Sequence, residues 1–257
     1  MTWKIPDFDA QTLSTTANRQ LADRLPMSVD GAKKKSTPPL TTRIFPDHWW
    51  DEHFWTDLRL AGAYRDVVSS LKLDDLPPAK EVEAELAELM AFQASPEREE
   101  RRREILEEAD RPPPCYANAL FLDAGRRPLT RELMGTAVNW SRMFIMTFKH
   151  QYKRPRPTQL EPRLKPMVPC PQHPAYPSGH STQSHLLALI FGKLSGRPDV
   201  EKAMLEAADR IAANREYAGL HYRSDSAAGV ALARQLLPIF EHEFAKPITA
   251  ARVAEWS

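Results

Sequence analysis

The balance between proline and glycine constrains the fold of this chain more than any other feature of its sequence. The 257 residues include 23 prolines and only 9 glycines. So few glycines argue against a turn-rich β-sandwich and against a doubly wound α/β fold with glycine-rich loops. So many prolines are typical of helices joined by stiff connectors. Because no segment shows the alternation expected of a strand, the sequence predicts an all-α fold.

Apolar residues recur with helical spacing through most of the second half of the chain. The strongest pattern runs over Pro128–Tyr152, where one apolar face is expected to form the core of a bundle. Further helices are expected over residues 178–194, 198–217 and 225–244. The segment Lys153–Pro177, which follows the long helix, holds eight prolines and no helical pattern. The predicted architecture is therefore a helix bundle with one long proline-rich loop.

The first third of the chain has a different character. Residues 1–46 are polar and aperiodic, which is typical of an arm along the surface or a partly ordered tail. Helices are expected over residues 47–73 and 81–92, and Ser95 is expected to cap a third. The run Glu97–Arg111 carries charges of both signs. We interpret it as the solvated face of a helix, with ion pairs four residues apart, rather than as a docking strip.

Three consecutive prolines at positions 112–114 mark the main organisational boundary. Residues 1–111 are predicted to form an N-terminal arm and helices that pack on the same core as the rest of the chain. Residues 112–257 are predicted to form the helix bundle that carries the functional site.

Composition and charge exclude several classes of protein. Lys and Arg number 35 against 34 Asp and Glu, so a net charge of +1 gives no field to attract nucleic acid. The longest apolar run, Leu186–Phe191, is far too short to span a membrane, and the N-terminus lacks the apolar core of a signal peptide. Two cysteines, Cys115 and Cys170, are too few for a disulfide scaffold. These observations predict a soluble, cytoplasmic protein and leave open whether it forms a homo-oligomer.

Three short blocks carry candidate chemistry, and the first surrounds the end of the long helix. Lys149 is expected on the last turns of that helix. Pro155 and Pro157 force Arg154 and Arg156 toward extended backbone. This arrangement can direct Lys149 and Arg156 at one point, although a basic helix C-terminus is the simpler interpretation of this block on its own.

The second block is Pro177-Ser178-Gly179-His180, at the expected start of a helix. Either Ser178 or Ser181 can cap that helix. The free N–H groups and the dipole of a helix N-terminus suit a phosphate-like anion. Gly179 lets the backbone approach such an anion closely, and His180 can then exchange a proton with it.

The third block runs from Arg215 to Asp225. Gly219 is expected to interrupt the helix between Arg215 and His221. Asp225 opens the next helix, close enough to accept a hydrogen bond from one ring nitrogen of His221. That bond would fix the tautomer and raise the basicity of the other nitrogen, as a nucleophile or a metal ligand requires. Taken alone, the block also fits a surface Arg–Asp pair with an incidental histidine.

Finding all three blocks in one chain is a coincidence of about one in a million at average residue usage. In this order they resemble the superfamily of type 2 phosphatidic acid phosphatases, bacterial class A acid phosphatases and vanadium-dependent haloperoxidases. The matching positions are Lys149, Arg156, Pro157, Pro177, Ser178, Gly179, His180, Arg215, His221 and Asp225. Asn214 departs from the serine usual in the family, a flanking change that we expect to cost little. The resemblance covers about residues 128–236.

The resemblance implies a metal-independent phosphatase that hydrolyses small-molecule phosphate esters. It implies that His221, oriented by Asp225, attacks phosphorus and forms a phosphohistidine, and that His180 is the acid–base group. The phosphate-binding residues that it implies are Lys149, Arg156, Ser178, Gly179 and Arg215. Neither a metal nor another cofactor is expected for this reaction.

The haloperoxidases of the same superfamily give the alternative function. In those enzymes the residue that matches His221 binds vanadate, so vanadate would be the cofactor and the reaction would be halide oxidation by hydrogen peroxide. His173, five residues before Ser178, resembles the algal bromoperoxidases. Met146 stands where the fungal chloroperoxidases have tryptophan, which argues against this function, as does the shorter chain.

Two further interpretations have less support. A binding module without activity would need a broken constellation, whereas every catalytic position is occupied. Tryptophans 49, 50 and 55 would suit contact with a substrate, but tryptophan on a helical stripe is more often a core residue. The loop Lys153–Pro177 is expected to cover the mouth of the site.

Overall fold

The computed structural model describes residues 44–45, 57, 61–109 and 126–256, all of which belong to one compact unit, Pro39–Ser257. Their regular structure is helical, and none of these residues lies in a strand. The all-α prediction is therefore confirmed for the described part of the chain. The features predicted for the N-terminal arm up to residue 43, for tryptophans 49, 50 and 55, for the prolines at 112–114 and for Cys115 lie outside the described residues.

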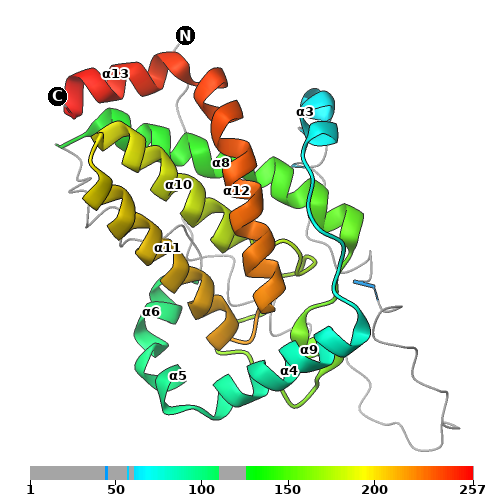
Figure 1. Cartoon of the computed structure of the whole chain (residues 1–257). Coiled ribbons are helices and arrows are strands. Elements are labelled where there is room, and N and C mark those ends of the chain that lie inside the picture. The colour runs from blue at the N-terminus through cyan, green and yellow to red at the C-terminus, as the bar shows by residue number, and fades with distance from the viewer. Residues whose placement is uncertain (1–43, 46–56, 58–60, 110–125, 257) are drawn as a thin grey trace, which may run out of the picture. The chain divides into compact units, whose positions relative to one another are not determined.

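Helix α10 (Gly179–Ser195) is the centre of the bundle. It packs against α8 (Pro128–Tyr152), α11 (Pro198–Tyr217) and α12 (Arg223–Glu243), which lie around it in Figure 1. Eleven of its residues are buried, because its sequence is apolar or small almost throughout. A helix that is apolar on most sides is stable only when other helices cover it.

Helix α8 buries the face that its periodicity predicted. Leu133, Ala137, Trp140, Phe144 and Phe148 are each at most 5% exposed. The rings of Trp140 and Phe144 meet edge to face with 4.7 Å between their centroids, which is a favourable aromatic geometry. This packing fixes the direction in which the last turns of α8 point.

Local signals set the ends of α10 and α11. The Ser178 side chain accepts a hydrogen bond from the N–H of Ser181 and so caps α10, as predicted. Helix α11 ends at Tyr217, and Gly219 adopts a positive φ of 76° that turns the chain away from the helix axis. The predicted interruption at Gly219 is therefore present.

Two C-terminal features differ from the predictions. Helix α12 begins at Arg223, two residues earlier than predicted, because Asp225 accepts a hydrogen bond from the N–H of Tyr222 and so occupies the third helical position. A further helix that was not predicted, α13 (Ala245–Glu255), packs against α8. The Glu255 carboxylate accepts the N–H of Thr130 at 2.9 Å, which satisfies one of the free donors at the start of α8.

The described elements before α8 are short. They are η3 (Gly62–Tyr64), α3 (Arg65–Ser70), α4 (Ala79–Ala94), α5 (Pro96–Glu100) and α6 (Arg102–Glu107). The helix predicted to reach residue 73 ends three residues earlier, where Leu71 becomes extended. Ser95 caps α5 as predicted, by accepting the N–H of Arg98.

The interpretation of residues 97–111 as a solvated helix face is wrong for one side of this segment. Ion pairs four residues apart are present on the outer side, as between Arg103 and Glu107. On the inner side, Ile105 is fully buried, Glu108 is only 7% exposed, and Arg101 donates to the Asn214 side chain at 2.9 Å. Charge alternation alone could not distinguish the two sides, because arginine and glutamate occur on both.

The loop Lys153–Pro177 contains one short helix, α9 (Pro157–Leu160), which was not predicted. Pro157 occupies its first position, where the missing N–H of proline costs nothing. Among the helices that the structure describes, none combines the length and the apolar character needed to cross a bilayer.

Candidate active site

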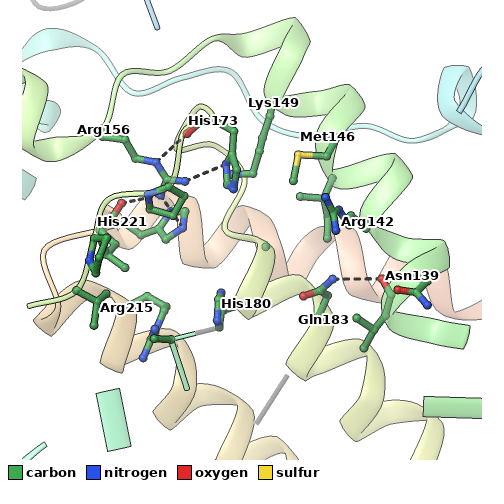
Figure 2. A pocket seen from close by; sticks show the side chains of 18 residues that line it. Asn139, Arg142, Met146, Lys149, Arg156, His173, His180, Gln183, Arg215 and His221 are labelled. Carbon is green, nitrogen blue, oxygen red and sulfur yellow. Dashed lines mark hydrogen bonds between the residues drawn. The ribbon is translucent and has the colours of Figure 1, made fainter. Parts of the chain in front are cut away.

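A pocket of about 370 Å³ lies at the N-terminal end of α10. Its wall includes six of the predicted site residues: Lys149, Arg156, Gly179, His180, Arg215 and His221. Figure 2 labels all of these residues except Gly179, together with His173, and on the opposite side of the pocket Asn139, Arg142, Met146 and Gln183. Val168, Pro169, Pro171 and His173 of the proline-rich loop also line the pocket, so the loop lies at the site as expected.

His221 and Asp225 form the pair that their spacing predicted. Nδ1 of His221 lies 3.0 Å from a carboxylate oxygen of Asp225, and the Asp225 side chain is fully buried. Because a carboxylate only accepts, Nδ1 carries the hydrogen and Nε2 of the neutral ring keeps its lone pair. Burial lowers the pKa of His221 well below its ordinary value, and the charges of Arg156 and Lys149 lower it further. At neutral pH His221 is therefore an uncharged ring whose Nε2 carries a lone pair.

Arg156 connects the loop to His221. Its Nη1 lies 3.0 Å from Nε2 of His221 and also donates to the carbonyl of Leu220. Its Nε and Nη2 meet the carbonyl and the Nδ1 of His173, at 2.9 and 3.0 Å. Arg156 therefore contacts both His173 and His221 directly.

Lys149 is fully buried, and all its donors are in use. Its Nζ donates to the carbonyls of Pro174, Ala175 and Pro177 at 2.7–2.8 Å. Burial lowers the pKa of Lys149 well below its ordinary value, and the nearby charge of Arg156 acts in the same direction. Lys149 therefore fixes the loop just before α10 and places its ammonium group at the pocket wall.

Arg215 has N–H groups that bind no acceptor among the described residues. It is fully buried, and its Nη2 donates to the carbonyl of Ile105 and the carboxylate of Glu108. Its Nε and Nη1 have no hydrogen-bond partner among the described residues. Buried donors are rarely left unpaired, because each unpaired donor costs about 1–3 kcal/mol. Three N–H groups of Arg215 are thus available to a bound anion.

The N-terminus of α10 supplies His180 and a free backbone edge. The carbonyl of Glu108 accepts a hydrogen bond from His180 Nε2 at 2.8 Å. Burial and the charge of Arg215 lower the pKa of His180 to about 4. Ser178, fully buried as the cap of α10, does not line the pocket, whereas Gly179 does.

Sequence reasoning missed the acidic residues that surround the site. Asp225 accepts Arg154 Nη1 at 2.6 Å, and Glu85 of α4 accepts Arg154 Nη2 at 2.7 Å. Glu108 plays the corresponding role for Arg215. Neither glutamate stands in a recognisable motif, and each lies more than 65 positions from its arginine, so no local signal identified them.

A close approach of α10 and α12 was also missed. A Cβ atom on Gly229 of α12 would lie 2.7 Å from Cβ of Ser181 and 2.9 Å from the carbonyl oxygen of Ser178. Only glycine leaves room for the start of α10 at this distance. Gly229 therefore helps to place the N-terminus of α10 beside His221 and Asp225.

The site as a whole is built to bind an anion beside a nucleophile. Buried guanidinium groups, the unpaired donors of Arg215 and a helix N-terminus lie in one pocket with the Nε2 lone pair of a neutral imidazole. Among the residues that the structure describes, no group of three or more His, Cys, Asp or Glu side chains is arranged to hold a metal ion. These features define a helical protein with an oxyanion pocket suited to phosphate or an analogue of phosphate.

Comparison with known proteins agrees with this class. Residues 133–241 match the model of the PAP2 superfamily, in agreement with the resemblance carried by the three sequence blocks. No curated protein is similar enough to the chain to count as a match. All of the pocket residues contributed by α8, α10, α11 and the loop fall within the matched region.

Two of the solved structures that are similar to the chain illustrate the range of the likeness. One is a bacterial vanadium-dependent iodoperoxidase, with 24% identity and a TM-score of 0.38 over 44% of this chain and 32% of that protein. The chain thus spans about a third of the length of that peroxidase. The other is a transmembrane PAP2-type phosphatidylglycerolphosphate phosphatase from Bacillus subtilis, with 18% identity and a TM-score of 0.46 over 75% of this chain and 97% of that protein. Neither likeness specifies an activity.

Proposed function

We propose that this protein is a metal-independent phosphatase that hydrolyses small-molecule phosphate esters through a phosphohistidine on His221. The observation that carries the proposal is the juxtaposition of His221 Nε2 with the unpaired N–H groups of Arg215 in one pocket. A phosphoryl group needs this combination, because its transition state spreads negative charge over three oxygens while a nucleophile approaches in line.

In the first step, the lone pair of His221 Nε2 attacks phosphorus and the bond from phosphorus to the ester oxygen breaks. Asp225 stabilises the positive charge that develops on the ring. His180 donates a proton to the departing oxygen; because its pKa is lowered to about 4, it must take up this proton before the step. Because Arg156 Nη1 contacts Nε2 in this structure, substrate binding must transfer that N–H from His221 to a phosphoryl oxygen.

In the second step, water attacks the phosphohistidine and the bond from phosphorus to Nε2 breaks. His180, now neutral, accepts a proton from the water. Arg215, Arg156 and the backbone N–H of Gly179 are proposed to hold the equatorial oxygens in both steps. Lys149 contributes its charge rather than a hydrogen bond, since backbone carbonyls occupy its three donors. Ser178 contributes by capping α10.

The experiment is hydrolysis of p-nitrophenyl phosphate in the presence of EDTA, with vanadate as a competitive inhibitor. His221→Ala should reduce turnover by at least about 10³-fold while preserving the helical circular dichroism spectrum. His180→Ala should slow turnover more with phenyl phosphate, a poor leaving group, than with p-nitrophenyl phosphate. His242→Ala, at an exposed position of α12, is the matched control. Acid-labile phosphate incorporated at a residue other than His221 would contradict the mechanism.

A vanadate-dependent haloperoxidase is the second candidate, and His173 is the observation that favours it. Its imidazole lies in the pocket at 3.0 Å from Arg156. The residues present also fit vanadate, because His221 Nε2 would ligate it and the unpaired donors of Arg215 would bind its oxygens. Bound vanadate would supply the centre that activates hydrogen peroxide for halide oxidation.

Bromide oxidation after loading with vanadate separates the two candidates. We expect weak bromination at most, because polar and charged side chains share the pocket with apolar ones, whereas peroxidase chemistry favours an enclosed apolar approach. Rapid bromination at micromolar vanadate, with no phosphate released from any ester, would reverse the order of the two candidates.

A further inference from the structure

Glu108 touches two of the proposed catalytic groups at once. It follows α6, outside the region that matches the PAP2 superfamily, and is 7% exposed. Its carboxylate accepts Arg215 Nη2 at 3.0 Å. Its backbone carbonyl accepts His180 Nε2 at 2.8 Å. One residue therefore contacts both the cation with free donors and the acid–base histidine.

The contact with Arg215 determines which edge of the guanidinium faces the pocket. Nη2 has two hydrogens, and these go to the carbonyl of Ile105 and the carboxylate of Glu108. Both acceptors belong to the end of α6. The remaining three N–H groups, on Nε and Nη1, stay free of protein acceptors in the described part of the chain. The α6 segment thus binds one edge of the Arg215 guanidinium and leaves the other edge directed at the pocket.

The contact with His180 determines its tautomer. A carbonyl oxygen only accepts, so Nε2 of the neutral ring must carry the hydrogen. Nδ1 then holds the lone pair. This is the arrangement that a general base needs when it accepts a proton from water.

Asn214 holds the Glu108 carboxylate in place. Its Nδ2 lies 3.1 Å from both carboxylate oxygens of Glu108 and from a carboxylate oxygen of Glu104. Its Oδ1 accepts Arg101 Nη1 at 2.9 Å. A serine, which the resembling family usually has at this position, has one hydroxyl hydrogen and could not serve both carboxylates. The departure at Asn214 therefore accompanies the acidic residues of α6.

We propose that Glu108 is a positioning residue for Arg215 and His180, and that Asn214 holds it in this role. The proposal rests on the phosphatase function proposed above. The negative charge of Glu108 also lies beside the anion pocket. Glu108 therefore weakens anion binding while it orients Arg215 and His180. Orientation and affinity should therefore change in opposite directions when that charge is removed.

The test compares Glu108→Gln with Glu107→Gln. Glu107 is the neighbouring residue, is exposed, and in the described part of the chain pairs with Arg103 alone. The measurements are kcat and KM for p-nitrophenyl phosphate, and the Kd of orthovanadate by isothermal titration calorimetry. Glu108→Gln should lower kcat at least tenfold and tighten vanadate binding at least threefold, while Glu107→Gln leaves both unchanged. Asn214→Ser should act in the same directions with a smaller effect.

A residue with a merely structural role would reduce the folded fraction without changing KM or Kd. The inference is overturned if Glu108→Gln matches Glu107→Gln in both measurements. It is also overturned if the maximal rate and the number of vanadate sites per protein fall in proportion to the folded fraction measured by circular dichroism. If the wild type binds vanadate but hydrolyses no ester, the phosphatase proposal fails, and the vanadate affinities alone decide the role of Glu108.

Discussion

Replacing Glu85 with glutamine tests whether α4 stabilises the ion pair between Arg154 and Asp225, the partner of His221. Glu85 accepts Arg154 Nη2 at 2.7 Å and the N–H of Ser224 at 2.7 Å. Arg154 is 3% exposed and also binds Asp225, the partner of His221. A glutamine keeps the shape and one acceptor oxygen, but it removes the charge and points an NH₂ group at one of the two donors.

The expected loss in the free energy of unfolding follows from the burial of Arg154 and Asp225. Hydrogen bonds to charged groups contribute about 1.5–3 kcal/mol each, and a buried arginine loses half of its compensating charge in this variant. We expect Glu85→Gln to lower the free energy of unfolding by about 2–3 kcal/mol. Glu88, one turn further along α4, is the matched control, because its pair with Arg223 is exposed. Such surface pairs contribute about 0–1 kcal/mol.

Urea unfolding followed by circular dichroism measures the difference. With an m-value of about 3 kcal/mol/M, Glu85→Gln should lower the midpoint by about 0.7–1 M, and Glu88→Gln by less than about 0.3 M. Equal midpoints for the two variants would refute the argument that burial makes the Glu85–Arg154 pair important. A lower kcat in folded Glu85→Gln protein would show further that the pair supports the His221–Asp225 geometry.

Three further predictions concern packing and pH. Gly229→Ala should lower the free energy of unfolding by about 1–3 kcal/mol, measured by the same urea assay, because the added methyl group would overlap Ser181 and the backbone of Ser178. Burial raises the pKa of Glu216 to about 7, so the protonated carboxyl stabilises the folded protein at a pH below the unfolded pKa, and this stabilisation is lost as the pH rises toward 7. Glu216→Gln should therefore stabilise the protein by about 1–2 kcal/mol at pH 8 and hardly at pH 4.5, measured in parallel thermal melts. His180 gives the opposite pH dependence of stability, because its pKa is lowered to about 4 and the unfolded chain therefore binds the proton at a higher pH than the folded chain does. Stability should fall as the pH drops from 6.5 toward 4, and His180→Asn should make the free energy of unfolding less dependent on pH in this range.

The parts of the fold that the sequence predicted are those controlled by neighbouring residues. The long helix Pro128–Tyr152 was predicted with both ends correct, since its apolar period is unbroken and Pro128 stands at its first position. The Ser178 cap and the break at Gly219 depend on single residues of strong local preference. Helix α13 was missed because Pro247 reads as a stop signal after α12, although proline is tolerated in the first turn of a helix.

The site was predictable where its residues lie close together in the sequence. His221 and Asp225 are four positions apart, and their hydrogen bond follows from that spacing. Glu85 and Glu108 reach the site through contacts that span 69 and 107 positions. Both are ordinary glutamates in charged helices, and only the packing of α4 and α6 against α11 and α12 gives them a role. Periodicity cannot report such contacts, because it describes one element at a time.

The balance of buried charge explains why α4 and the end of the α6 segment matter to the site. Among the described residues around the pocket, four buried cations face three carboxylates: Lys149, Arg154, Arg156 and Arg215 against Glu85, Glu108 and Asp225. Two of the three carboxylates come from α4 and α6, so the region that matches the PAP2 superfamily would bury its arginines with much less compensation without them. The compensation leaves an excess of positive charge at the pocket, since neither Lys149 nor Arg156 pairs with a carboxylate among the described residues, while lowered pKa values keep His180 and His221 neutral. A phosphate monoester carries a charge of about −1.5 to −2 at neutral pH, so its binding would offset this excess and pair the free donors of Arg215.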